Sequence, residues 1–148
     1  MQLSRLGEDE NPEMNNRCLL LADAHPNMLA AVRELLAGRF RATVMVADES
    51  SLLEAIGRME PDLVVVDFSL PVSGGVNVVR TLFNRYPNSR VIVLSVHDEQ
   101  SALSHVLSAG AAGFVLKRTA AVDLTAAVDA VLRGKTFISG ALGGRPGA

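Results

Sequence analysis

Short apolar runs alternate with amphipathic helical patterns along most of the chain, and this alternation strongly constrains the fold. The runs are Cys18–Ala22, Ala42–Ala47, Leu63–Val66, Val91–Leu94 and Gly113–Leu116. After most of these runs, apolar residues recur with the i, i+3, i+4, i+7 spacing of a helix that has one buried face. Such a (βα)₅ repeat requires a parallel sheet covered by helices on both faces, so we predict an α/β fold with a doubly wound, five-stranded parallel sheet.

The third run, Leu63–Val66, is continuous and mostly β-branched, which is typical of a strand buried on both faces. It is followed directly by Asp67. Open parallel α/β sheets bind their ligands at the carboxyl ends of their strands, so Asp67 is a candidate functional residue. From its position alone, an Asp that caps or turns the chain is the alternative.

Length and composition favour one globular domain. The chain has 148 residues, 49% of them hydrophobic, and a net charge of −2, which gives no broad basic surface for nucleic acid. The single cysteine, Cys18, has no partner for an internal disulfide. Neither a signal peptide nor an apolar stretch long enough to span a membrane is found, so we expect a cytoplasmic protein with no membrane contact.

The domain boundaries follow from the same pattern. Residues 1–16 are polar and acidic and are expected to form a flexible tail. Residues 17–134 contain all five strand–helix units and are expected to form the domain. Residues 135–148 are rich in glycine and lack periodicity, which predicts a linker or a frayed end.

Polar residues follow each predicted strand, at the sheet edge where the carboxyl ends of parallel strands meet. In strand order they are Asp23, then Asp48 and Glu49, then Asp67, Ser95 and Lys117. Asp48 and Glu49 are also suited to starting the second helix, where acids interact with the helix dipole. The others fit phosphoryl transfer to a carboxylate: a nucleophilic Asp, acids for Mg²⁺, a lysine for a phosphoryl oxygen and a hydroxyl for a hydrogen bond.

The chain resembles the response-regulator receiver domains of bacterial two-component systems. Four segments show the resemblance: LLLADAHP, VVVDFSLPVSGG, VIVLSVHDE and AGFVLKRTA. The segment ADAHP and the closing AVDAVLRGKTFIS are similar to the NarL/LuxR-type subfamily. The resemblance covers about residues 17–134 and implies the flavodoxin-like strand order 2-1-3-4-5.

The resemblance also implies roles for individual residues. Asp67 matches the phosphoacceptor, Lys117 the lysine that binds the phosphoryl group and Ser95 the switch hydroxyl. Phe114 matches the aromatic residue whose rotamer follows that hydroxyl, although a purely structural core role explains it equally well. The Mg²⁺ ligands would be Asp23, Asp67 and the backbone carbonyl of Ser69.

One position departs from the family pattern. Receivers usually carry two adjacent acids after the first strand, but here Asp23 is followed by Ala24. Because the missing acid is generally a direct Mg²⁺ ligand in the family, we expect weakened Mg²⁺ binding and slow phosphorylation. The neighbouring His25, like His97, is interpreted as a solvated loop histidine.

The leading hypothesis is therefore a signalling domain, not an enzyme. A sensor histidine kinase would phosphorylate Asp67, and the altered surface would act on an output domain or partner protein, or allow homodimerisation. DNA contact is not expected from these residues, because the tail is too short for a helix-turn-helix.

The alternative is a degenerate receiver that acts as a phosphorylation-independent interaction module. A phosphatase of the haloacid dehalogenase type would require an acid at Ser69, and a flavodoxin-like flavin protein would require a phosphate loop after the first strand.

Overall fold

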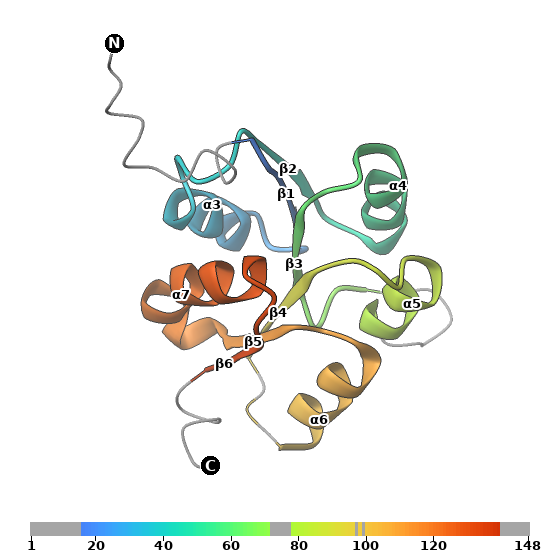
Figure 1. Ribbon diagram of the computed structural model, residues 1–148, viewed down its shortest axis with the longest axis vertical. Coiled ribbons are helices and arrows are strands. Elements are labelled where there is room, and N and C mark those ends of the chain that lie inside the picture. The colour runs from blue at the N-terminus through green and yellow to red at the C-terminus, as the bar shows by residue number, and fades with distance from the viewer. Residues whose placement is uncertain (1–15, 72–77, 97, 99, 140–148) are drawn as a thin grey trace.

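The computed structural model describes residues 16–71, 78–96, 98 and 100–139. In this part of the chain, six parallel strands form one sheet in the order β2-β1-β3-β4-β5-β6 (Figure 1). The strands are β1 (Cys18–Ala22), β2 (Ala42–Val46), β3 (Leu63–Asp67), β4 (Val91–Ser95), β5 (Gly113–Leu116) and β6 (Phe137–Ile138). The predicted order 2-1-3-4-5 of the first five strands is confirmed.

Helices cover both faces of the sheet, as the strand–helix alternation predicted. They are α3 (Pro26–Leu35), α4 (Glu49–Met59), α5 (Val78–Arg85), α6 (Gln100–Ala109) and α7 (Ala120–Leu132), with a 3₁₀ turn, η3, at Lys117–Thr119. In Figure 1, α3 and α7 lie on one side of the sheet and α4, α5 and α6 lie on the other. Among the described residues, no helix is long and apolar enough to cross a membrane.

Successive residues of the central strands belong to two separate cores. In β3, Val64 and Val66 pack in the core beneath α4, α5 and α6, whereas Leu63 and Val65 pack in the core beneath α3 and α7. This period of two is the geometry of a strand, and both of its phases are apolar because both faces are covered. The strands appear in the sequence as continuous apolar runs because both of their faces are buried.

Residues at two helix starts have clear structural roles. Pro26 is the first residue of α3, where the missing N–H breaks no hydrogen bond. Asp48 caps α4 by accepting a hydrogen bond from the Ser51 N–H at 2.8 Å, and Glu49 begins the helix. The Ser51 N–H that donates to Asp48 lowers the pKa of that carboxyl below its ordinary value. The Asp48–Glu49 pair therefore starts a helix, as its position in the sequence predicted.

The prediction of a five-stranded sheet followed by a tail from residue 135 is wrong at its C-terminal boundary. β6 pairs in parallel with β5, with Phe137 opposite Gly113 and Ile138 opposite Phe114. Ser139 is fully buried, and its Oγ accepts a hydrogen bond from the Leu116 N–H at 2.9 Å. A two-residue strand is too short to show periodicity, so this element escapes pattern analysis. Residues 1–15 and 140–148, where tails were also predicted, lie outside the described residues.

A small polar cluster holds this last segment against the domain. The Ser139 hydroxyl donates to Asp123 Oδ2 at 2.9 Å, and the Thr119 hydroxyl donates to the same oxygen at 2.8 Å. Asp123 lies in the first turn of α7, so the cluster joins β6, β5 and α7 at one point. The two hydroxyls thus share one Asp123 oxygen, and the Ser139 hydroxyl also gives the Leu116 N–H an acceptor.

We predict that Ser139→Ala lowers the free energy of unfolding by about 1–3 kcal/mol, because the Leu116 N–H would lose its acceptor in a buried environment. Urea denaturation measures the change. Ser104→Ala is the matched control, since Ser104 is exposed on α6 and should change stability by less than about 0.5 kcal/mol. Equal stability of the two variants would show that the cluster does not anchor β6.

Candidate functional site

Strand register brings the predicted site residues together. Ala22 pairs with Val66, so Asp23 and Asp67, each the next residue, lie side by side at the carboxyl ends of β1 and β3. Ser95 pairs with Leu116, so Lys117 follows directly beyond the ends of β4 and β5. Asp67 and Ser95 are themselves the last residues of their strands, one residue further than the sequence predicted. The sheet backbone therefore holds both residues in place.

Lys117 forms ion pairs with two buried carboxylates. Its Nζ lies 3.0 Å from Asp23 Oδ2 and 3.3 Å from Asp67 Oδ1. Both acids are almost completely buried, with exposed fractions of 3% and 2%. Two adjacent anions in a poorly solvated site repel each other strongly unless a cation compensates them. Lys117 provides that compensation.

The remaining carboxylate oxygens face His25. Asp23 Oδ1 accepts hydrogen bonds from the His25 backbone N–H at 2.8 Å and contacts the ring Nδ1 at 2.9 Å. Asp67 Oδ2 is 4.0 Å from the same Nδ1, and it is buried without a hydrogen-bond partner. Asp67 Oδ1, by contrast, also accepts the Ser69 N–H at 3.1 Å. We call Asp23, His25, Asp67 and Lys117 the carboxylate site.

The residues of the carboxylate site fit a divalent cation. Asp23, His25 and Asp67 each offer a ligand atom, and these atoms lie within 4.8 Å of one another. An unpartnered buried carboxylate oxygen is costly unless a cation or donor satisfies it, so Asp67 Oδ2 is a natural ligand. Ala24 is exposed and offers no oxygen from its side chain, so the site has one carboxylate fewer than the usual receiver pattern.

The interpretation of His25 as a solvated histidine is only partly correct. Its side chain is 69% exposed, but the ring nitrogen Nδ1 points to the two carboxylates. The sequence contained a relevant signal, since His25 lies two residues after Asp23 and directly before Pro26, the first residue of α3. Which way the ring turns depends on the local backbone, which the pattern does not reveal. His97 lies outside the described residues.

Ser95 and Phe114 are fully buried on neighbouring strands. Phe114 pairs with Val93, two residues before Ser95, so both side chains belong to the same face of the sheet. Phe114 packs in the core beneath α4, α5 and α6. The core role that the sequence allowed for Phe114 is therefore observed. A switching role for Phe114 stays a prediction. Metal binding by the Ser69 carbonyl also stays a prediction.

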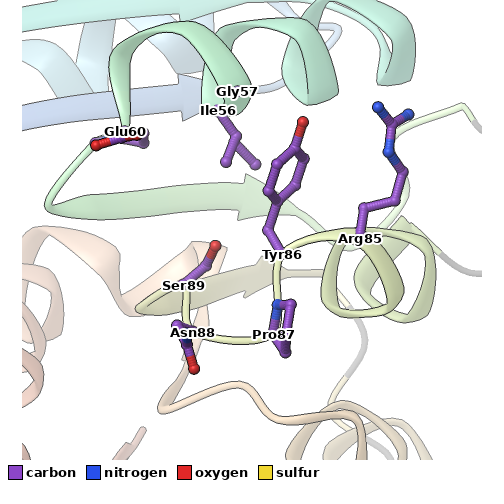
Figure 2. Close-up of a pocket in the computed structure, with 9 residues that line it drawn as sticks. Ile56, Gly57, Glu60, Arg85, Tyr86, Pro87, Asn88 and Ser89 are labelled. Atoms are coloured by element: carbon purple, nitrogen blue, oxygen red, sulfur yellow. The ribbon is translucent and has the colours of Figure 1, made fainter.

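A cavity of about 470 Å³ lies away from the carboxylate site, between the C-terminal ends of α4 and α5 (Figure 2). Its lining includes Glu60, Arg85 and Tyr86. The Tyr86 hydroxyl donates to the Leu53 carbonyl at 3.2 Å, and Gly57 leaves room for it, because a Cβ there would lie 2.7 Å from the hydroxyl oxygen. The loops of this cavity lead into the starts of β3 and β4, the opposite end of the sheet from Asp67.

The doubly wound fold and the lysine-bridged carboxylates at its strand ends match the receiver resemblance seen in the sequence. The chain belongs to the response regulator receiver domain family, whose model matches residues 19–129. This family is a signalling family of two-component systems and not a class of classical enzymes.

Named relatives agree with this assignment. The transcriptional regulatory protein DegU of Brevibacillus brevis is 33% identical over 132 residues, which cover 88% of this chain and 56% of that protein. MctR of Rhizobium johnstonii, also a transcriptional regulatory protein, is 30% identical over 125 residues, covering 82% of this chain and 58% of MctR. This chain thus spans little more than half the length of these relatives.

Solved receiver domains have the same fold. The isolated receiver domain of RcsB from Salmonella enterica serovar Typhimurium, determined with the phosphomimetic BeF₃⁻, superposes with a TM-score of 0.76 at 26% identity, covering 84% of this chain and 94% of that one. The receiver domain of the response regulator NarL from Mycobacterium tuberculosis gives a TM-score of 0.71 at 27% identity, covering 82% and 99%. The resemblance to the NarL/LuxR-type subfamily is confirmed.

We predict that Lys117→Met lowers the free energy of unfolding by about 3 kcal/mol, because it leaves two buried carboxylates without their cation. Urea denaturation in a buffer free of divalent cations measures the change. Lys135→Met is the matched control, since Lys135 is exposed and should contribute less than about 0.5 kcal/mol. Equal stability of the two variants would contradict a compensating role for Lys117.

Proposed function

We propose that Asp67 accepts a phosphoryl group from the phosphohistidine of a sensor kinase in the cytoplasm. The observation that carries the proposal is the contact between Lys117 Nζ and Asp67 Oδ1 at 3.3 Å. In the transfer, a bond forms between a carboxylate oxygen of Asp67 and phosphorus, and the bond between phosphorus and the kinase imidazole breaks. The leaving imidazole takes up a proton from solvent.

The carboxylate site suggests which oxygen reacts. Asp67 Oδ1 is the oxygen beside Lys117, so a phosphoryl group attached there would be within reach of the ammonium. Asp67 Oδ2 has no hydrogen-bond partner and is left to face a cation. A bound Mg²⁺ would neutralise charge on the transferring group. Asp23, Asp67 and the Ser69 carbonyl would hold it, weakly because position 24 lacks a carboxylate.

We further propose that phosphorylation is read out through Ser95 and Phe114. A hydrogen bond from the Ser95 hydroxyl to the phosphoryl group would pull the end of β4 toward Asp67. Phe114, on the same sheet face, would then repack. The affected surface is formed by α6, β5 and α7. Val122 on α7 is 77% exposed, and Val96, the residue directly after β4, is 60% exposed. These apolar side chains support a contact with an output domain, a partner protein or a second copy of the domain.

The regulated output is proposed to be transcription. DegU and MctR are transcriptional regulatory proteins, and RcsB has been solved in complex with DNA. Because this chain spans little more than half of its relatives, DNA binding would reside in a further domain and not in these residues. The chain itself would contact the kinase and the output domain.

A second candidate function is a degenerate receiver that acts without phosphorylation. Ala24 favours it, because the loss of one carboxylate reduces the charge available to hold Mg²⁺. Such a domain would keep the fold and use the surface of α6, β5 and α7 for binding. The two candidates differ in whether Asp67 forms an acyl phosphate.

We predict that incubation with acetyl phosphate and Mg²⁺ adds one phosphoryl group to the protein and that Asp67→Asn abolishes the addition. Intact-mass spectrometry detects the adduct, and hydroxylamine should remove it, because acyl phosphates are labile to this nucleophile. Asp62→Asn is the matched control, since its carboxylate binds the Cys18 N–H at the other end of the sheet. If the wild type forms no adduct while Ala24→Asp gains one, the domain is a phosphorylation-independent module.

We predict that Ala24→Asp increases Mg²⁺ affinity by about tenfold, roughly 1.4 kcal/mol, because it adds a carboxylate beside Asp23 and Asp67. Isothermal titration calorimetry measures the affinity. Ala24→Asn controls for side-chain volume and should give a smaller increase. Equal affinities for the wild type and Ala24→Asp would show that position 24 does not reach the cation.

A further inference from the structure

The four oxygens of the two buried carboxylates divide between two partners. Lys117 takes Asp23 Oδ2 and Asp67 Oδ1, while Asp23 Oδ1 and Asp67 Oδ2 are directed toward His25 Nδ1. The lysine thus compensates one side of the pair. On the other side, an imidazole nitrogen and two carboxylate oxygens converge, and one of these oxygens, Asp67 Oδ2, is buried without a hydrogen-bond partner.

The spacing of these three atoms suits a metal centre. A cation with ligand bonds of about 2.1 Å places adjacent octahedral ligands about 3 Å apart and opposite ligands about 4 Å apart. The distance from His25 Nδ1 is 2.9 Å to Asp23 Oδ1 and 4.0 Å to Asp67 Oδ2. A cation between them would satisfy Asp67 Oδ2 and would replace the present contact of Nδ1 with Asp23.

His25 is held in place by its backbone. It is the N-cap residue of α3, and its carbonyl accepts hydrogen bonds from the Met28 and Leu29 N–H groups. Its own N–H is bound to Asp23 Oδ1. Its side chain makes no capping hydrogen bond to the helix, so the imidazole stays turned toward the two carboxylates. The ring is 69% exposed, which leaves the outer side of the site open to water as the remaining ligands.

We propose that His25 Nδ1 is a direct metal ligand that takes the place of the carboxylate missing at Ala24. Its nitrogen changes the preference of the site from Mg²⁺ toward a divalent first-row transition metal, because imidazole is a good ligand for these ions whereas Mg²⁺ prefers oxygen. In the bound form, Nδ1 carries the metal and Nε2 carries the ring proton. The inference rests on the proposed function in assigning Asp23 and Asp67 to the cation.

Co²⁺ is the test ion, because it is paramagnetic and reports its own ligands. In calorimetry, the tag-free wild-type protein should bind Co²⁺ at least roughly tenfold more tightly than Mg²⁺. His25→Ala should lower the affinity for Co²⁺ roughly tenfold and change the affinity for Mg²⁺ by at most about twofold. His105→Ala is the matched control, since His105 is an exposed histidine on α6, and it should change neither affinity. Nuclear magnetic resonance should show hyperfine-shifted His25 ring signals in the wild type.

Two results would overturn the inference: unchanged Co²⁺ affinity in His25→Ala, or an equal loss in His105→Ala. A parallel acetyl phosphate assay separates this outcome from failure of the proposed function. If the wild type forms the Asp67 adduct with Mg²⁺ but His25→Ala binds Co²⁺ normally, the phosphoacceptor function stands and the metal inference fails. If His25→Ala loses Co²⁺ binding but no cation supports an adduct, the metal inference stands and the phosphoacceptor function fails.

Discussion

Two carboxylates buried side by side at the carboxyl ends of parallel strands are the constraint on which the site depends. Asp23 and Asp67 follow directly from the register of β1 and β3, and neither is solvated enough to tolerate the other as an unpaired anion. Lys117, supplied from the end of β5, satisfies one side of the pair. On the other side, Asp67 Oδ2 is buried without a hydrogen-bond partner and needs a cation or a donor.

The sheet supplies the rigidity that this arrangement requires. β3 is buried along its whole length, and both of its faces pack against apolar side chains from the helices. Asp67 ends this strand and therefore has little freedom to move away from Asp23. A loop position would let the two carboxylates separate into solvent, whereas a strand end between two packed layers keeps them together.

Ala24 and His25 give the carboxylate site of this receiver different side chains from the usual pattern of two adjacent acids. One carboxylate is absent, and an imidazole lies where it contacts Asp23 and approaches Asp67. The net charge of the site is accordingly less negative. In the C-terminal segment, Ser139 Oγ accepts a hydrogen bond from the N–H of Leu116, the residue before Lys117.

Most of the fold and three members of the carboxylate site could be predicted from the sequence. Apolar runs and helical spacing determined the five strand–helix units, and the polar residues after the strands identified Asp23, Asp67 and Lys117 as neighbours, because parallel strands share one carboxyl edge. Only the tertiary structure decided the rest. β6 is too short to have a period, the burial of Ser139 depends on contacts with distant Asp123, and the direction of the His25 ring depends on how α3 begins beside Asp23. These features arise from packing and local backbone geometry, which residue patterns do not encode.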